Sequence, residues 1–226
     1  MDSQLSNLTF SEFWTPISLS LEVAIVAWVV VLVAGIFAGQ GLARRSFRGK
    51  ALVETALMLP LVLPPTVVGF LLIIIFGKHS FIGEVIQSLF GQSLIFTWWA
   101  AVIASAVVAF PLMYQSAKVG FASVEASIEE AARMDGASEW KVFLYITLPL
   151  AKNALISGGI LSFCRALGEF GATLMFAGNI PGVTQTIPTA IYVALDSGNM
   201  TLAWCWVGTI IIISFMMLWI VQRKSH

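Results

Sequence analysis

Two ionisable residues lie inside a long apolar stretch of the chain, where a charge is costly. Arg165 and Glu169 stand four positions apart in SGGILSFCRALGEFGATLMF. A helix places residues i and i+4 on the same face, so the two side chains can neutralise each other. Ionisable groups inside apolar spans usually face a partner or a water-filled cavity. The spacing therefore leaves two interpretations open: a structural ion pair, or a pair that lines or gates a polar pathway.

Prolines and glycines could shape such a pathway. Pro64 and Pro65 stand in LPLVLPPTVVGF, and proline removes a backbone donor and clashes with the preceding turn. A helix here must bend or open, either as a packing kink or as part of a path that opens and closes. Gly168 and Gly171 flank Glu169, and small residues let membrane helices approach closely. The candidate pathway or gate residues are Pro64, Pro65, Arg165, Gly168, Glu169 and Gly171.

The sequence offers no pattern for catalysis at a metal, a nucleophile or a bound nucleotide. The only histidines are His79 and His226, so no cluster of His, Cys and carboxylates has metal-ligand spacing. No Ser or Cys stands in the motif of a hydrolase. Neither Gly49-Lys50 nor Gly77-Lys78 is followed by Ser or Thr, so neither belongs to a phosphate-binding loop. We therefore predict no catalytic residue, no metal and no cofactor in this chain, and no enzyme activity of its own.

A polar segment of about 36 residues, 118–153, separates two of the apolar stretches. Ser127 and Glu130 have the spacing of a capping box, which predicts the start of a helix. Gly136 can adopt the left-handed conformation that ends a helix, and Ser138 can then cap a second one. The segment is therefore a predicted helix–turn–helix.

The composition indicates the solvent in which these elements fold. Of the 226 residues, 58% are hydrophobic and 11% are charged, whereas a soluble domain has about 25% charged residues. Too few charges remain to cover a globule of this size, so apolar surface must face lipid. A formal net charge of zero argues against a nucleic-acid partner.

A membrane-spanning helix needs about 20 predominantly apolar residues. Continuous runs of this length predict helices rather than the alternating strands of a membrane barrel. The expected fold is an all-α integral membrane protein that forms one transmembrane domain over residues 1–226. The five predicted spans are Ile17–Gly39, Leu52–Phe76, Leu94–Ala117, Ala154–Ala177 and Leu202–Val221.

The distribution of basic residues predicts the orientation. Ten of the twelve Lys and Arg residues fall in the segments on one side of the five spans, and only Lys78 falls on the other. Cytoplasmic segments carry the excess of basic residues. We therefore expect the N-terminus outside, the C-terminus in the cytoplasm and segment 118–153 in the cytoplasm. Two short stretches are expected outside. FIGEVIQSLF is amphipathic, and TIPTAIYVAL is expected to form a short surface helix.

Segment 118–153 resembles a known element. Glu130-Ala131-Ala132, then Gly136, then Leu148-Pro149 are similar to the "EAA" loop of permease subunits of binding-protein-dependent ABC importers. The resemblance covers Glu130 to Pro149 and implies a type I ABC importer permease fold. It also implies that these residues couple the chain to a separate ATPase subunit, which binds ATP and Mg²⁺.

Two further stretches resemble one branch of this family. Residues 61–70 and 165–192 are similar to the permease of molybdate importers; sulfate and tungstate permeases share shorter forms of these motifs. The resemblance implies ATP-driven import of molybdate or tungstate by alternating access. It implies a homodimer, two ABC ATPase subunits, an extracytoplasmic molybdate-binding protein and a bacterial or archaeal cytoplasmic membrane. A sulfate-type or other oxyanion permease and an ATP-independent carrier are the alternatives, and the cytoplasmic loop argues against the carrier.

Overall fold

The structure of the chain is a computed structural model that describes residues 10–225. Every regular element in this part of the chain is a helix, which confirms the all-α prediction. The elements, in chain order, are α2 (Phe10–Ala43), α3 (Lys50–Val62), α4 (Pro65–Phe76), α5 (Phe81–Phe90), α6 (Trp98–Ala122), α7 (Ala126–Met134), α8 (Glu139–Val142), the π-helix η1 (Phe143–Thr147), α9 (Leu148–Leu150), α10 (Lys152–Leu167), α11 (Gly171–Phe176), α12 (Ile187–Asp196) and α13 (Met200–Ser225).

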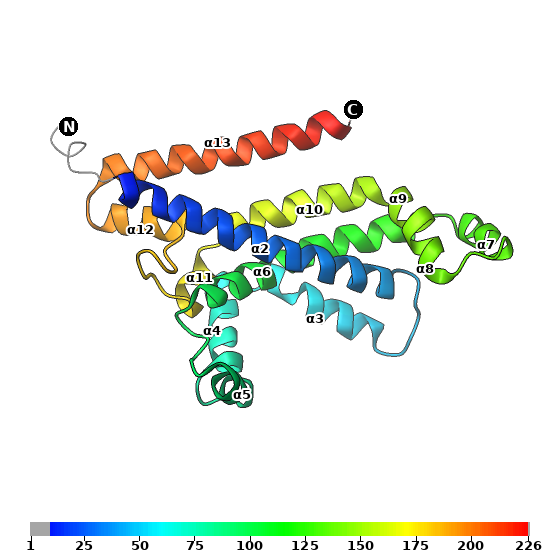
Figure 1. The fold of residues 1–226 in the computed structure, drawn as a ribbon, viewed down its shortest axis with the longest axis horizontal. Coiled ribbons are helices and arrows are strands. Elements are labelled where there is room, and N and C mark those ends of the chain that lie inside the picture. Colours follow the sequence, from blue (N-terminus) through cyan, green and yellow to red (C-terminus); the bar gives the residue numbers. More distant parts are fainter. Residues whose placement is uncertain (1–9, 226) are drawn as a thin grey trace.

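Helix α6 is the centre of the molecule. Helices α2 and α10 both pack against α6 and against each other, and the three lie side by side along the long axis (Figure 1). The contacts use small side chains: Ala104, Ala109 and Ala117 of α6 and Ala24 and Ala27 of α2 are completely buried. Because small residues let helix backbones approach closely, they suit a core that forms within lipid.

The prolines break the second predicted span. Helix α3 ends at Val62 and α4 begins at Pro65, and their axes differ by 118°. Leu63 has the extended conformation (φ −69°, ψ 143°) that a residue before proline prefers. Pro65 stands at the first position of α4, where its missing N–H costs no helical hydrogen bond. The predicted bend is confirmed.

The fourth predicted span, Ala154–Ala177, is not one helix. Helix α10 ends at Leu167, and α11 begins at Gly171 after three non-helical residues. The carboxylate of Glu169 accepts the backbone N–H of Ala172 at 2.8 Å, which satisfies one of the free donors at the start of α11. The prediction of a continuous helix is therefore wrong at this break.

Three described helices, α2, α6 and α13, are each long and apolar enough to cross a membrane. Two bent pairs also qualify when each is taken as one span: α3 with α4, and the helical segment Glu139–Leu150 with α10, bent by 73°. The five predicted spans therefore correspond to the largest number that these helices allow.

The two short outer stretches both form helices. Helix α5 starts at the Ser80 cap, whose hydroxyl accepts the N–H of Gly83 at 2.9 Å. Helix α12 is more buried than the expected surface helix, because it packs against α13 and α2. Its first N–H, on Ile187, donates to the hydroxyl of Ser20 in α2 at 2.7 Å.

Candidate functional site

The interruption between α3 and α4 lies next to the one between α10 and α11. Helices α4 and α11 pack together, and Gly171 and Pro65 approach each other closely at this contact. A Cβ atom added at Gly171 would lie 2.9 Å from the Cβ atom of Pro65, so only glycine fits without a shift. Two of the predicted pathway residues, from opposite halves of the sequence, are thus in contact. Discontinuous helices that meet in this way form binding and gating regions in membrane transporters.

The predicted pair of Arg165 and Glu169 is confirmed as an ion pair. A guanidinium nitrogen of Arg165 lies 2.6 Å from Oε2 of Glu169. The Glu169 side chain is 1% exposed and that of Arg165 is 29% exposed. The carboxylate is therefore enclosed between α10 and α11, whereas the guanidinium reaches the surface. The other oxygen of Glu169 accepts the Ala172 N–H, so this side chain joins the end of α10 to the start of α11.

The remaining predicted pathway residues lie at the same two breaks. Pro64 precedes α4, with an extended backbone (φ −53°, ψ 136°). Gly168 is the C-terminal cap of α10, with φ −87°, so no left-handed conformation is needed there. The structure therefore places all six residues at two neighbouring helix interruptions. Whether they line a pathway stays a prediction.

Segment 118–153 contains α7, a tight turn and a second helical stretch, as predicted. Gly136 has a φ of +84°, the left-handed conformation expected for it. The N–H of Ala137 donates to the carbonyl of Ala132 at 3.0 Å, and that of Gly136 to Arg133 at 3.0 Å. This pattern is a Schellman motif, which satisfies the free carbonyls at the end of a helix.

The predicted capping box is wrong. The N-cap of α7 is Glu125, with φ −64° and ψ 130°, and Ser127 lies in the first turn. The Ser127 hydroxyl donates to the Glu125 carboxylate at 3.4 Å instead of accepting a backbone N–H. The chain becomes extended directly after Val124, which is buried, and this places the helix start ahead of the serine.

The predicted coupling residues differ in exposure. Glu130 and Ala131 are exposed on α7, and Ala132 is half-buried. Leu148 and Pro149 belong to α9, at the far end of the second helical stretch, where Leu148 is half-buried and Pro149 is exposed. The structure therefore groups the residues of α7 and the Gly136 turn, and separates them from Leu148 and Pro149.

Apolar side chains that the sequence analysis did not select are also exposed on this segment. Met134 is 84% exposed, Trp140 59% and Tyr145 76%. Large exposed apolar residues on a polar segment indicate a surface for another protein. For Met134 and Trp140 the signal in the sequence was an apolar residue between charged ones, whereas Tyr145 stands in the apolar run FLYIT and gave no such signal. Arg133 and Glu139 join the two helices across the turn, with Nε of Arg133 2.7 Å from Oε1 of Glu139. The hydrogen bond to Arg133 lowers the pKa of Glu139.

The sequence analysis also missed Glu129. This carboxylate is 4% exposed and contacts Arg44, Thr147 and Arg133. A weak signal existed: Glu129 and Ala132, three apart on α7, share the face that is turned inward.

A polar cluster lies in a groove between α3 and α6. The ammonium group of Lys118 lies 2.7 Å from Oε1 of Glu54, and that of Lys50 lies 3.8 Å from the same oxygen. Glu54, Lys118 and Gln115 help to line an open pocket of about 460 Å³. Helix α3 has no buried residue in the single chain, so this groove opens onto an uncovered helix face.

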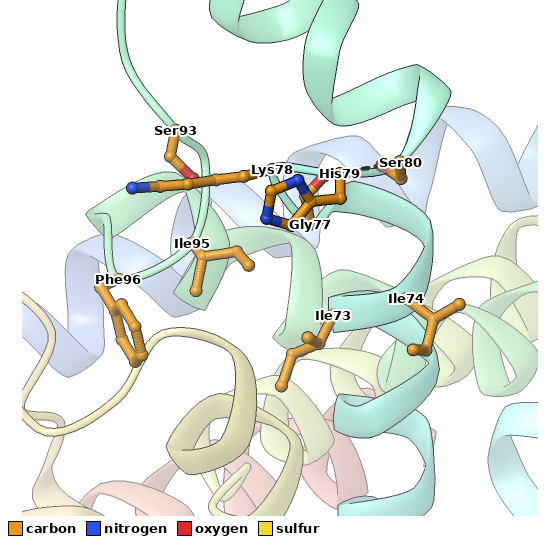
Figure 2. Close-up of a pocket in the computed structure, with 9 residues that line it drawn as sticks. All are labelled: Ile73, Ile74, Gly77, Lys78, His79, Ser80, Ser93, Ile95 and Phe96. Atoms are coloured by element: carbon orange, nitrogen blue, oxygen red, sulfur yellow. Dashed lines mark hydrogen bonds between the residues drawn. The ribbon is translucent and has the colours of Figure 1, made fainter.

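A second pocket of about 680 Å³ opens beside the α4–α5 turn. Ile73, Ile95 and Phe96 form its apolar part, and Lys78 and Ser93 are among its polar residues (Figure 2). Among the described residues, no carboxylate lies within ion-pair distance of Lys78. The Ser93 hydroxyl makes no hydrogen bond to the described residues, and a cation beside such a donor can bind an anion.

Comparison with known proteins agrees with this arrangement. The family model described as the binding-protein-dependent transport system inner membrane component matches residues 31–223. The chain is 67% identical to YvgM of Bacillus subtilis (strain 168), across 97% of each chain; the name of YvgM assigns it to a molybdenum transport system as a permease protein. It is 47% identical to the molybdenum transport system permease protein ModB of Escherichia coli (strain K12), over 81% of this chain and 80% of ModB.

The fold is similar to that of a membrane transporter of known structure. A chain of the bacterial alginate ABC transporter, crystallised with its alginate-bound periplasmic protein, superposes with a TM-score of 0.74. The sequence identity is 15%, and the match covers 100% of this chain and 82% of that one. With broken helices around α6, a helix–turn–helix segment and a family match over residues 31–223, the chain belongs to the binding-protein-dependent transport system inner membrane component family.

Proposed function

We propose that this chain is the membrane-spanning permease of an ATP-driven importer that moves molybdate or tungstate into the cytoplasm. The observation that carries the proposal is the segment of α7 to α9, which presents Glu130, Ala131 and exposed apolar side chains at one end of the helix bundle (Figure 1). A membrane protein that transports without a partner has no evident use for such a surface. A permease driven by a separate ATPase subunit requires one.

The substrate follows from the relatives. Both reported relatives carry names that refer to molybdenum transport, and one of them matches at 67% identity over nearly the full length. Molybdate and tungstate have the same charge and shape, so the proposal includes both. A sulfate-type permease is the second candidate, and an ATP-independent carrier is the third.

The proposed assembly is a homodimer with two ATPase subunits and an extracytoplasmic binding protein for the oxyanion. The ATPase subunits bind ATP and Mg²⁺. Helix α3 supports a second copy, because it is uncovered in the single chain and borders the groove that holds Glu54 and Lys118.

In the proposed mechanism the binding protein releases the oxyanion at the outer face of the dimer. ATP draws the ATPase subunits together, the coupling segments move inward, and the pathway opens outward; hydrolysis resets it. The meeting point of α4 and α11 at Pro65 and Gly171 is the proposed place where the pathway opens and closes. In this proposal the chain lies in the cytoplasmic membrane with its N-terminus outside and its C-terminus in the cytoplasm.

The test is uptake of radiolabelled molybdate into vesicles that contain this chain, the ATPase subunit and the binding protein. We expect uptake to require ATP and all three proteins, and to be inhibited by tungstate but not by an equal concentration of sulfate. Equal inhibition by sulfate would favour the sulfate-type reading. Uptake without the ATPase subunit would support an ATP-independent carrier and overturn the proposal.

A further inference from the structure

Glu129 is a buried carboxylate where α7, η1 and the residue that follows α2 meet. Its Oε1 accepts the hydroxyl of Thr147 in η1 at 2.7 Å. Its Oε2 pairs with Arg44, which directly follows α2, and lies 3.6 Å from a guanidinium nitrogen of Arg133. A buried carboxylate is tolerated only where cations and donors surround it. The cluster therefore fixes the position of α7 relative to α2 and η1.

Arg44 extends this junction to the central helix. Besides Glu129, its guanidinium donates to the carbonyl of Val124, and it lies 3.5 Å from the carbonyl of Phe121. Phe121 lies in the last turn of α6 and Val124 two residues beyond its end, where the helix dipole favours a cation. Arg44 thus contacts the ends of both α2 and α6 and, through Glu129, reaches the coupling helix.

Few other contacts join α7 to the membrane helices. Its main packing neighbours are α8 and η1, which belong to the same cytoplasmic segment, and Figure 1 shows α7 at the far end of the bundle. Its outer face carries Glu130 and Ala131. A force applied to that face reaches α6 along the chain through residues 123–125, and the side chains of Glu129 and Arg44 extend it to the end of α2 and tie α7 more firmly to α6.

We propose that Glu129 and Arg44 are positioning residues for energy coupling: they join the coupling helix to α2 and α6, so that the three move as one body. This inference rests on the proposed function, since it concerns the same coupling segment. Without the link, α7 follows the ATPase subunit while the membrane helices lag behind. The ATPase subunit then binds and hydrolyses ATP, and less substrate moves per ATP.

The chain contains matched controls for both residues. Arg45 is the exposed neighbour of Arg44 and makes no ion pair among the described residues. Glu130 is the exposed neighbour of Glu129. Because it lies on the outer face of α7, its substitution should have an effect of its own, different from that of Glu129. Its substitution by Gln is expected to weaken binding of the ATPase subunit, whereas the Glu129 variant keeps that binding.

The experiment measures ATP hydrolysed per molybdate transported in vesicles that contain the complete transporter. Glu129→Gln and Arg44→Gln should each raise this ratio about tenfold, which lies within the range of typical coupling effects between two sites. The ATPase subunit should co-purify with both variants in normal amount. Arg45→Gln should leave the ratio at the wild-type value. A wild-type ratio in Glu129→Gln and Arg44→Gln, or an equal rise in Arg45→Gln, would overturn the proposal.

A second measurement does not depend on transport. Spin labels at positions 46 and 127, in dimers diluted with unlabelled chain, report the distance between the loop after α2 and α7. We expect a narrow distribution in the wild type and a broad one in Arg44→Gln, in which Glu129 still has Arg133 and Thr147 beside it. An equally narrow distribution in the variant would contradict the link. If the wild type fails to transport molybdate, the proposed substrate is wrong, while the spin-label result still decides whether Glu129 and Arg44 hold α7.

Discussion

Glu129 and Glu130 are adjacent residues of the same type in entirely different surroundings. Glu129 is enclosed by cations from α2 and α7 and by a hydroxyl from η1, whereas Glu130 faces solvent. The sequence motif identifies Glu130, because its position relative to Ala131 and Gly136 is local. The role of Glu129 depends on Arg44, 85 residues away in the chain, and no local pattern reports that partner.

The turn at Gly136 leads to a prediction at one residue. A Cβ atom at this position would meet nothing within 4 Å, so any effect of substitution comes from the backbone. Gly136→Val should destabilise the turn by about 1–2 kcal/mol, because a β-branched residue disfavours the left-handed conformation. Co-purification of the ATPase subunit and molybdate uptake should both fall, while the protein remains in the membrane.

The matched control for this turn is Gly136→Asn, since asparagine tolerates the left-handed region. This variant should retain most of the ATPase binding and uptake. Normal binding and uptake by Gly136→Val would refute a conformational role for the glycine.

The pair of Arg165 and Glu169 leads to a second prediction. Arg165→Met leaves the buried carboxylate without its cation and should destabilise the protein by about 3–5 kcal/mol. Adding Glu169→Gln removes the charge and keeps an oxygen for the Ala172 N–H, so the melting temperature in detergent should recover.

Uptake by the double variant separates the two roles of the pair. We expect the double variant to be stable but to transport poorly, because it lacks the partly exposed guanidinium of Arg165. A polar pathway would use this group. Full uptake would eliminate the pathway role and leave a structural ion pair.

The helix breaks show which features of an element can be predicted from local sequence. The bend at Pro64 and Pro65 was predictable, because proline acts on its own turn. The break after Leu167 was not predictable, because glycine also occurs inside helices, as Gly158 and Gly159 do in α10. The start of α11 depends instead on the Glu169 carboxylate and on contact with α4. The helix–turn–helix was predictable from Gly136, but its first residue depended on the burial of Val124.

The contact between α4 and α11 gives a prediction at this scale. Gly171→Ala places a methyl group 2.9 Å from the Cβ atom of Pro65, and overpacking of this kind costs about 1–3 kcal/mol. The melting temperature and uptake should therefore both decrease.

Gly208 in α13 is the control, because an added Cβ atom meets nothing within 4 Å there. Gly208→Ala should be neutral or stabilising by about 0.5–1 kcal/mol, as expected for a glycine in a helix. A Gly171→Ala variant as stable and active as Gly208→Ala would show that close approach of the two breaks is dispensable.

At the scale of the whole molecule, the orientation proposed from the basic residues is open to direct test. In a variant without Cys164 and Cys205, a cysteine at Ser46 should react only with reagents that reach the cytoplasm. A cysteine at Gln87, an exposed position of α5, should react from outside. Position 87 is preferable to Ser80, whose hydroxyl caps α5. The reverse labelling pattern would invert the assignment of the α7 segment to the cytoplasm.

The junction at Arg44 also has a consequence for biosynthesis. Arg44 leaves the ribosome long before Val124 and Glu129, and it can meet them only after α2 and α6 have been inserted and packed side by side. We therefore expect newly made chains to acquire a correctly oriented α7 late, once the central helices are in place. An ATPase subunit that recognises this orientation would bind finished chains and pass over unfinished ones, so the same contact would serve as a checkpoint for assembly.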